Sequence, residues 1–403
     1  MTQQSLVNRL ATTFISPEAT FGLGGGAVSQ IWPKSGSFDD SRDQEEVTVD
    51  DESPYFFDEK TALLGLKSGG CKFSTNVVPA GGLLNAAASP ATPPHSIALK
   101  AMLGGEQANA GSLVATGTSP TQVTVTAGQG SRLPAGTLCL VEVAGTLYPT
   151  FVATQSTDTL TFGIALPGTP GTGALVINAY QYYPTDANSS SLEVRRALVG
   201  DANEQYQYLG CNGNFELNLE RGKLITETYN LTCADWNEGA LGYSTAFAAN
   251  SQGSGFVLKN AVTLLQTPAT TTRTNLPFTS LALKFSTAMA LQEEHGGING
   301  WSAWQRTGME RVACEVTLRT RIDRQLVTWW NARTQLRLFH ATMAGSGLTA
   351  RAHMVHLPLL TPRGAPKIVD VGGRRLHEFR AVTQIDGTLA TALQRAPYVL
   401  GRA

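Results

Sequence analysis

The chain has 403 residues, enough for two or three domains and for a sizeable buried core. Only 15% of the residues are charged, and 30 basic against 31 acidic side chains leave a net charge of -1, which argues against non-specific nucleic-acid binding. The first residues lack the apolar core of a secretory signal, and no run of about 18 apolar residues could span a membrane. We therefore expect a protein that is made in a reducing cytoplasm.

An acidic stretch lies near the N-terminus, between Phe38 and Lys60. Its acidic residues are Asp39, Asp40, Asp43, Glu45, Glu46, Asp50, Asp51, Glu52, Asp58 and Glu59. From Arg306 onward, by contrast, fifteen Arg or Lys stand against six acids, a net charge of +9. Two interpretations remain open: both segments are solvated surfaces, or they meet between neighbouring copies of the chain and fix their register. For the second interpretation the candidate contacts are Asp39, Asp40, Asp43, Glu45, Glu46, Asp50 and Asp51.

The next segment predicts a strand followed by a short helix. Phe73, Thr75 and Val77 alternate with polar residues, as in a half-buried strand. After Pro93 and Pro94, residues 95–103 contain good helix formers and end at a glycine pair, which is the usual punctuation of a helix. We expect this helix to fill the open side of a sheet.

Residues 112–178 differ from the rest in composition. Their only charged residues are Arg132, Glu142 and Asp158, and Gly- and Pro-containing turns separate short β-branched runs. We interpret 112–178 as a small β domain inserted into a discontinuous core domain of residues 1–111 and 179–403.

The remaining segments also predict strands. Phe215, Leu217 and Leu219 alternate with polar residues, and similar alternation recurs around residues 281–285 and 312–318. Asp323 is a plausible N-cap for a second helix that carries Leu326, Trp329 and Trp330. Several strands separated by turns argue for an all-β protein, an antiparallel sandwich or barrel with one or two short helices that fill the open side of the sheet.

Three segments share one design, a glycine-containing turn that leads into an alternating strand: GLKSGGCKFSTNV (65–77), YLGCNGNFELNLERGKL (208–224) and GMERVACEVTLRT (308–320). The third leads into the Asp323 helix and then into strands at 334–342, 350–360 and 373–385. This order of strand, helix and three-strand meander resembles the tail tube proteins of long-tailed bacteriophages. Residues 56–104 and the insertion at 112–178 are similar to segments found in members of that family.

The resemblance implies a structural virion protein rather than an enzyme, with no cofactor and no metal. It implies hexameric rings that stack into the tail tube through which DNA is ejected. The implied partners are other copies of the chain and the tape measure, terminator and distal tail proteins, with transient, non-specific passage of DNA and no membrane. The protein would be assembled in the host cytoplasm, and the inserted domain would lie on the tube exterior.

A tail tube must let DNA slide, so its wall should be neutral or acidic, because each Lys or Arg on a phosphate adds affinity. The polar side of residues 213–220 is our candidate for the wall: Asn214, Glu216, Asn218 and Glu220. An ordinary solvated outer face is the alternative interpretation.

Motifs of common enzymes are absent, including GxSxG, HExxH and the Walker A loop. The glycines at 22–26 follow no predicted strand and suggest a loop, and His353 and His356 should point to opposite faces of a strand. The five cysteines lie 22 or more residues apart, so we expect neither a disulfide framework nor a zinc site. A rival to the tail tube interpretation is a β-rich tail or fibre component that binds carbohydrate. Its binding platform would be Trp301, Trp304, Trp329 and Trp330, although core or subunit-contact roles are favoured for them.

Overall fold

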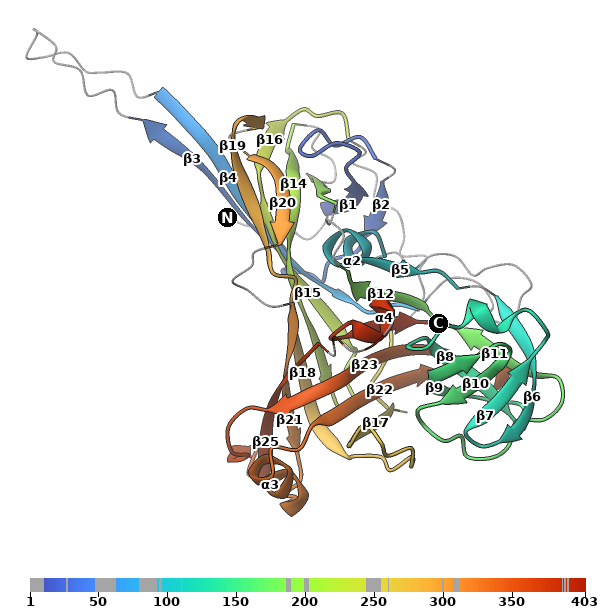
Figure 1. The fold of residues 1–403 in the computed structure, drawn as a ribbon. Helices are drawn as coiled ribbons and strands as arrows, with labels where there is room; N and C mark the ends of the chain where they lie inside the picture. Colours follow the sequence, from blue (N-terminus) through green and yellow to red (C-terminus); the bar gives the residue numbers. More distant parts are fainter. Residues whose placement is uncertain are drawn as a thin grey trace, which may run out of the picture.

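The computed structural model describes residues 11–26, 28–47, 63–79, 93, 96–109, 111–185, 190–198, 203–243, 255–259, 261–298, 301–306, 312–385, 387, 389 and 391–403. These residues form one large 18-stranded sheet that folds into several layers, a separate two-stranded sheet and a closed barrel, with a few short helices. The all-β prediction is therefore confirmed. The layers follow one another across Figure 1, with the barrel at one side.

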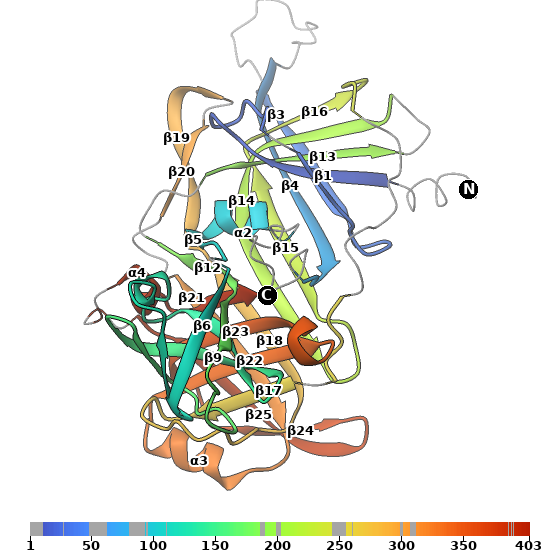
Figure 2. The same cartoon turned by 90° about the vertical axis from the view of Figure 1, so that its right-hand side faces the viewer.

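The first layer is a long antiparallel sheet that we call the open sheet, because one of its faces is uncovered. Its order is β3–β4–β15–β14–β18–β21–β25–β24. The strands are β3 (Asp39–Val47), β4 (Leu63–Asn76), β14 (Gln205–Glu220), β15 (Thr226–Cys233), β18 (Phe278–Ser286), β21 (Ala313–Thr320), β24 (Lys367–Val371) and β25 (Arg374–Thr383). Hairpin β3–β4 projects from the body (Figures 1 and 2).

The second layer, the covered sheet, has the order β5–β12–β26–β23–β22–β17. Its strands are β5 (Gly104–Gln107), β12 (Tyr180–Pro184), β17 (Ala261–Gln266), β22 (Leu336–Ala344), β23 (Arg351–Pro362) and β26 (Val399–Arg402). The end of β23 also pairs with β25, so the chain turns from the open sheet into the covered sheet without a break.

The core between these two sheets comes from strict alternation along the strands. Phe215 on β14 stacks on Phe285 of β18 at 4.5 Å between ring centroids, and Phe285 meets Tyr398 beside β26 at 4.8 Å. Helix α2 (Ser96–Leu103) lies in the same core with most of its side chains buried. The predicted alternating strands and the predicted first helix are confirmed.

Above the sandwich lies an upper sheet with the order β2–β1–β13–β14–β16. Its other strands are β1 (Ala11–Pro17), β2 (Ser29–Ile31), β13 (Leu192–Leu198) and β16 (Asp235–Gly239). Strand β14 belongs to both sheets. It turns at Gly210, whose φ of +60° favours glycine, and a Cβ there would come within 2.8 Å of the Ala234 side chain.

Six strands of residues 112–178 form a closed barrel in the order β10–β7–β6–β11–β8–β9. They are β6 (Ser112–Ser119), β7 (Gln122–Val125), β8 (Leu138–Val143), β9 (Thr146–Ser156), β10 (Thr159–Phe162) and β11 (Ala174–Asn178), with a 3-10 turn η1 at Gly130–Arg132. Val123, Leu160 and Val176 are fully buried inside the barrel.

The barrel packs on the far side of the covered sheet. Phe339 and Met354 on that side share a core with Leu140 and Phe151 of the barrel. Arg337 of β22 donates a hydrogen bond to the Gly163 carbonyl at 3.0 Å. Removal of residues 112–178 would therefore uncover apolar surface on the covered sheet, which weighs against the prediction that deletion of this segment leaves straight tubes.

The remaining elements are hairpin β19 (Met289–Ile298) and β20 (Trp301–Arg306), helix α3 (Arg324–Asn331), the 3-10 turn η2 (Gly347–Thr349) and helix α4 (Ala392–Arg395). Asp323 caps α3 as predicted, because its Oδ1 accepts from the Gln325 amide at 2.8 Å. However, α3 does not fill the open side of the sheet. It lies at the lower end of the molecule with Leu326 as its buried side chain (Figure 1).

Candidate functional surface on the open sheet

The predicted polar side of β14 lies on the uncovered face of the open sheet. Asn214 and Glu220 are exposed, while Glu216 and Asn218 are half-buried by their neighbours on the same face. The intervening Phe215, Leu217 and Leu219 are buried in the sandwich core. The four predicted residues therefore share one face, and it is a face that no other part of the described chain covers.

Register extends this face across the neighbouring strands. Glu216 stands between Thr228 of β15 and Lys284 of β18, and Lys284 is followed by Glu315 of β21. Other polar or charged residues with some exposure on this face are Lys72, Ser74 and Asn76 on β4, Thr226 and Asn230 on β15, Ser280 on β18, and Thr317 and Arg319 on β21. We call this whole surface the open face.

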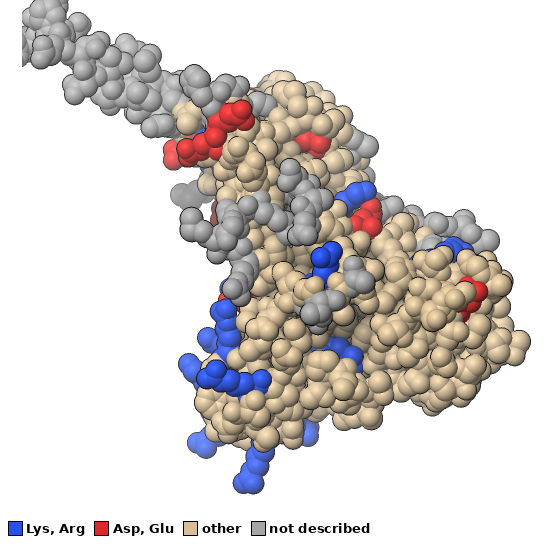
Figure 3. All heavy atoms as spheres, viewed as in Figure 1, with Lys and Arg blue, Asp and Glu red and all other residues tan. Residues whose placement is uncertain are grey.

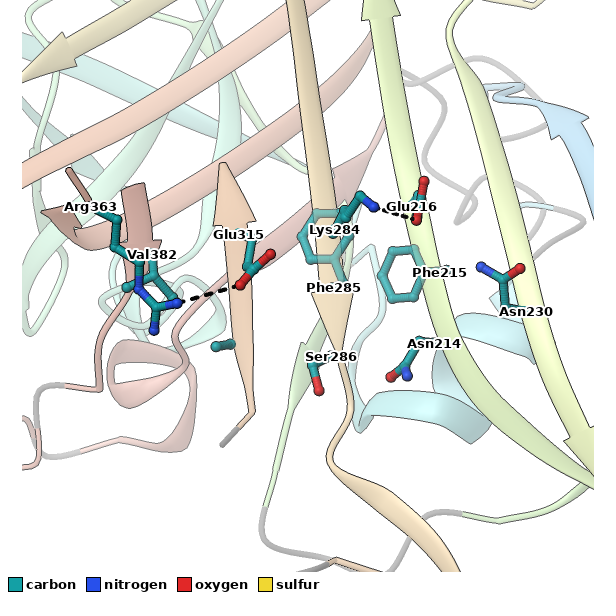
Figure 4. Close-up of a pocket in the computed structure, with 11 residues that line it drawn as sticks. Asn214, Phe215, Glu216, Asn230, Lys284, Phe285, Ser286, Glu315, Arg363 and Val382 are labelled. Carbon is teal, nitrogen blue, oxygen red and sulfur yellow. Dashed lines mark ion pairs between the residues drawn. The ribbon is translucent and has the colours of Figure 1, made fainter. Parts of the chain in front are cut away.

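A broad hollow of about 670 Å³ lies in the open face (Figure 4). Phe215 and Phe285 contribute to the floor of the hollow while their rings stay buried in the core, and charged side chains of the neighbouring positions stand around it. The Lys284 Nζ lies 3.3 Å from Glu216 Oε1, and Arg363 Nη1 lies 3.6 Å from Glu315 Oε1. The charges of the hollow are thus paired within the chain.

Pairing continues at the β25 edge of the open face. Glu378 accepts from Arg319 Nε at 3.0 Å and from Arg380 Nη2 at 2.7 Å. Burial would raise the pKa of Glu378, but hydrogen bonds and charge from the two arginines lower it below its ordinary value. One carboxylate between two arginines leaves this edge with a net positive charge, and the exposed Lys72 of β4 adds another, so pairing offsets the charges of the open face only in part.

The predicted stacking residues have different surroundings. Asp39 and Asp43 on β3 are exposed. Asp40 instead accepts a hydrogen bond from the Tyr208 hydroxyl at 2.6 Å and pairs with Arg42 at 3.2 Å, so it is a contact within the chain. Glu45 and Glu46 belong to β3, but their side chains lie outside the described residues, as do Asp50 and Asp51 altogether.

Exposed basic residues gather at the opposite end of the molecule, on and around α3 and hairpin β24–β25. They are Arg321, Arg324, Arg333, Lys367, Arg374 and Arg375. Figure 3 shows basic side chains at this lower end and acidic side chains near the β3–β4 end. Exposed Ile322 and Ile368 lie among the basic residues. The segregation of charge along the sequence is thus also a segregation in space.

The four tryptophans of the carbohydrate hypothesis do not form one platform. Trp304 on β20 is buried, and its Nε1 donates to the Gly210 carbonyl at 2.8 Å. Trp329 and Trp330 belong to α3, which lies at the other end of the molecule from β20 (Figure 1). Trp329 packs against the sandwich core, as favoured from the sequence.

The two close histidines do point to opposite faces of β23. His356 stacks on Phe151 of the barrel at 4.1 Å, whereas His353 faces Phe256. Burial lowers the pKa of His353 to about 3, so the ring is neutral near pH 7. In the part of the chain that the structure describes, no group of three or more His, Cys, Asp or Glu residues could hold a metal ion.

Every helix among the described residues is too short or too polar to cross a lipid bilayer. The chain matches no known protein-family model and no curated protein sequence.

Proposed function

We propose that this protein is the subunit of a hollow tube, a phage tail tube protein whose hexameric rings stack into a channel for DNA. The observation that carries this proposal is the open face, a wide sheet surface with polar side chains and largely paired charges on one side and a continuous apolar core on the other. A ring of such sheets would give a wall that does not hold phosphates.

The balance of charge matters because DNA carries one negative charge per about 1.7 Å of its axis. An unpaired row of lysines would bind it, and an unpaired row of glutamates would repel it. On the open face Lys284 is paired with Glu216, and Arg319 with Glu378. These pairs are partly exposed and contribute little to stability, but they cancel the field that DNA would meet.

The order of the three layers determines what would lie on the exterior if the open face lined the channel. The barrel lies behind the covered sheet, on the side away from the open face. With the open face on the channel, the barrel stands on the exterior and leaves the bore clear. The protein would then have no catalytic role, and its partners would be other copies of itself, the tape measure, terminator and distal tail proteins, with DNA only passing through the virion tail.

The decisive experiment is electron microscopy of the purified protein together with native mass measurement. We expect rings of six, about 257 kDa, which is six times the 42.8 kDa of one chain, and stacked rings at higher concentration. A chain that stays monomeric or trimeric at every concentration would contradict the proposal. Glycan-array binding by such a monomer would favour the carbohydrate-binding alternative.

Stacking should depend on the two charged ends. We expect Asp39→Lys with Asp43→Lys to prevent tube growth but not ring closure, because both side chains are exposed on the β3–β4 end. Arg374→Glu with Arg375→Glu should have the same effect, and mixing the two variants should restore alternating tubes. Tube length is measured by electron microscopy across a series of NaCl concentrations, and wild-type tubes should shorten as salt rises.

The control for added charge is a barrel variant with Thr116→Lys, Thr118→Lys, Thr124→Lys and Thr126→Lys, all at exposed positions. This barrel control changes the net charge by the same +4 as the Asp39 and Asp43 reversals. We expect it to form tubes of normal length. If tube length changes neither with salt nor with either charge reversal, charge-driven stacking is ruled out. The hypothesis that the open face lines the channel would still stand.

A further inference from the structure

Three cysteines that are far apart in the sequence meet beside the bend of β14. Cys71 of β4, Cys211 of β14 and Cys233 of β15 are all buried. The Sγ atoms of Cys211 and Cys233 lie 2.7 Å apart, and Cys71 is within hydrogen-bonding contact of both thiols. Cys139 and Cys314 are equally buried but belong to other parts of the core.

The register of the strands places Cys211 directly opposite Cys233. Asn212 pairs with Thr232 on one side of them, and Leu209 pairs with Asp235 on the other, without a shift in between. Directly opposite residues of antiparallel strands have Cα atoms about 4.5–5.5 Å apart. A disulfide needs a Cα separation of about 4.4–6.8 Å, so this pair meets the requirement without movement of the backbone.

The same geometry does not suit a metal ion. Two thiolates on one zinc ion, at about 2.3 Å each, would hold their sulfurs about 3.8 Å apart in a tetrahedral site. The 2.7 Å between Cys211 and Cys233 leaves no room for that. The arrangement therefore favours a bond between sulfurs over coordination.

Cys71 is the member of the group that lies next to a surface hollow. It contributes to the lining of that hollow with Asn230, Met289 and Trp304, although its own exposure is only 2%. Hydrogen bonds from Cys211 and Cys233 lower the pKa of Cys71, against the effect of burial, while burial raises the pKa of the other two thiols. The thiolate is the reactive form of cysteine.

We propose that Cys71, Cys211 and Cys233 form an oxidation site that takes a hydroperoxide as its oxidant and ends as a Cys211–Cys233 disulfide. The Cys71 thiolate attacks one peroxide oxygen, the O–O bond breaks, and Cys71 becomes a sulfenic acid while hydroxide leaves. Cys233 displaces water from this sulfur to form a Cys71–Cys233 disulfide. Cys211 then attacks Cys233 and releases Cys71 as a thiol. In total, two thiols lose two electrons and two protons to one hydrogen peroxide, which becomes two waters.

The product would tie β14 to β15 next to Gly210, where β14 passes from the upper sheet to the open sheet. It would close a loop from Cys211 to Cys233 within a single chain. Such a cross-link restricts the unfolded chain and stabilises the fold. The site is independent of the tube proposal, since a monomer would carry it equally.

The test is to treat the full-length native protein with hydrogen peroxide, block free thiols, and map disulfides by mass spectrometry of a tryptic digest without reduction. Each cysteine falls in a different tryptic peptide, and those of Cys211 and Cys233 are residues 197–221 and 224–259. We expect these two peptides to be linked, with Cys139 and Cys314 free. No linked pair, or a link that occurs equally with Cys139 or Cys314, would overturn the site.

The role of Cys71 is tested by rate. Cys71→Ser should still give the Cys211–Cys233 link but at least about tenfold more slowly, because the thiol that lies next to the hollow and has the lowered pKa is gone. Cys314→Ser is the matched control, a buried cysteine outside the group, and should oxidise at the wild-type rate. If Cys71→Ser oxidises as fast as the wild type, Cys71 is not the entry point. The disulfide map of the wild-type protein tests the main proposal even if a variant fails to fold.

Discussion

DNA ejection should be at least about tenfold slower through tubes that carry Glu216→Lys and Glu220→Lys than through wild-type tubes at low salt. Glu216 neutralises Lys284 at 3.3 Å, and Glu220 pairs with Lys223. The reversals would remove both partners and add lysines, so each ring of six would present a basic belt to the phosphates. The rate is measured by the fluorescence of a dye that binds DNA released from purified particles.

The barrel control carries the same added charge on the other side of the molecule and should eject DNA at the wild-type rate. Lys284→Glu, which makes the open face more acidic, should not slow ejection either. Raising the salt concentration should relieve the defect of the Glu216 and Glu220 variant, because screening weakens phosphate contacts. Equal ejection rates for this variant and the wild type would mean that the open face does not line the channel.

Arg402→Ala should lower the free energy of unfolding by about 3–5 kcal/mol, the range for one broken partner of a buried ion pair. Arg402 on β26 and Glu227 on β15 are fully buried and in direct contact, and Glu227 also accepts from the Tyr229 hydroxyl at 2.8 Å. Burial alone would lower the pKa of Arg402, but the charge of Glu227 raises it, so the guanidinium stays charged. Removal of the guanidinium would leave a buried carboxylate without its partner.

Urea unfolding followed by tryptophan fluorescence measures this effect. Arg395→Ala, at an exposed position of α4, is the matched control and should change stability by no more than about 0.5 kcal/mol. A second variant with Glu227→Gln and Arg402→Met has no buried charge and should recover much of the loss. Equal stability of Arg402→Ala and Arg395→Ala would mean that the pair does not hold β15 to β26.

The alternation of apolar and polar residues was enough to predict which side of β14 faces the core. It could not predict the neighbours of β14, because register depends on contacts between strands that are distant in sequence. Lys284 beside Glu216 was therefore missed, although it decides the charge of the open face. The period-2 pattern at 281–285 was the available signal, and it places Lys284 on the polar side.

The cysteine group shows the same limit. Spacings of 22 residues or more hold no short-range motif, yet three thiols converge because β4, β14 and β15 are neighbours in the open sheet. Arg402 also gave no signal, since a lone arginine near the end of a sequence is ordinarily exposed. Helix α3 was predicted correctly at its cap but not in its position, because burying Leu326 and part of Trp329 at the end of the sandwich is enough for its apolar side and does not require the open face.

The shared core of the barrel and the covered sheet has a practical consequence for particle engineering. A foreign peptide that replaced residues 112–178 would have to supply apolar side chains that cover Phe339 and Met354. A peptide spliced into the turn at Ala127 and Gly128 would not, because both residues are exposed and the turn lies outside that contact. Display on such particles should therefore begin at the rim of the barrel and leave its base intact.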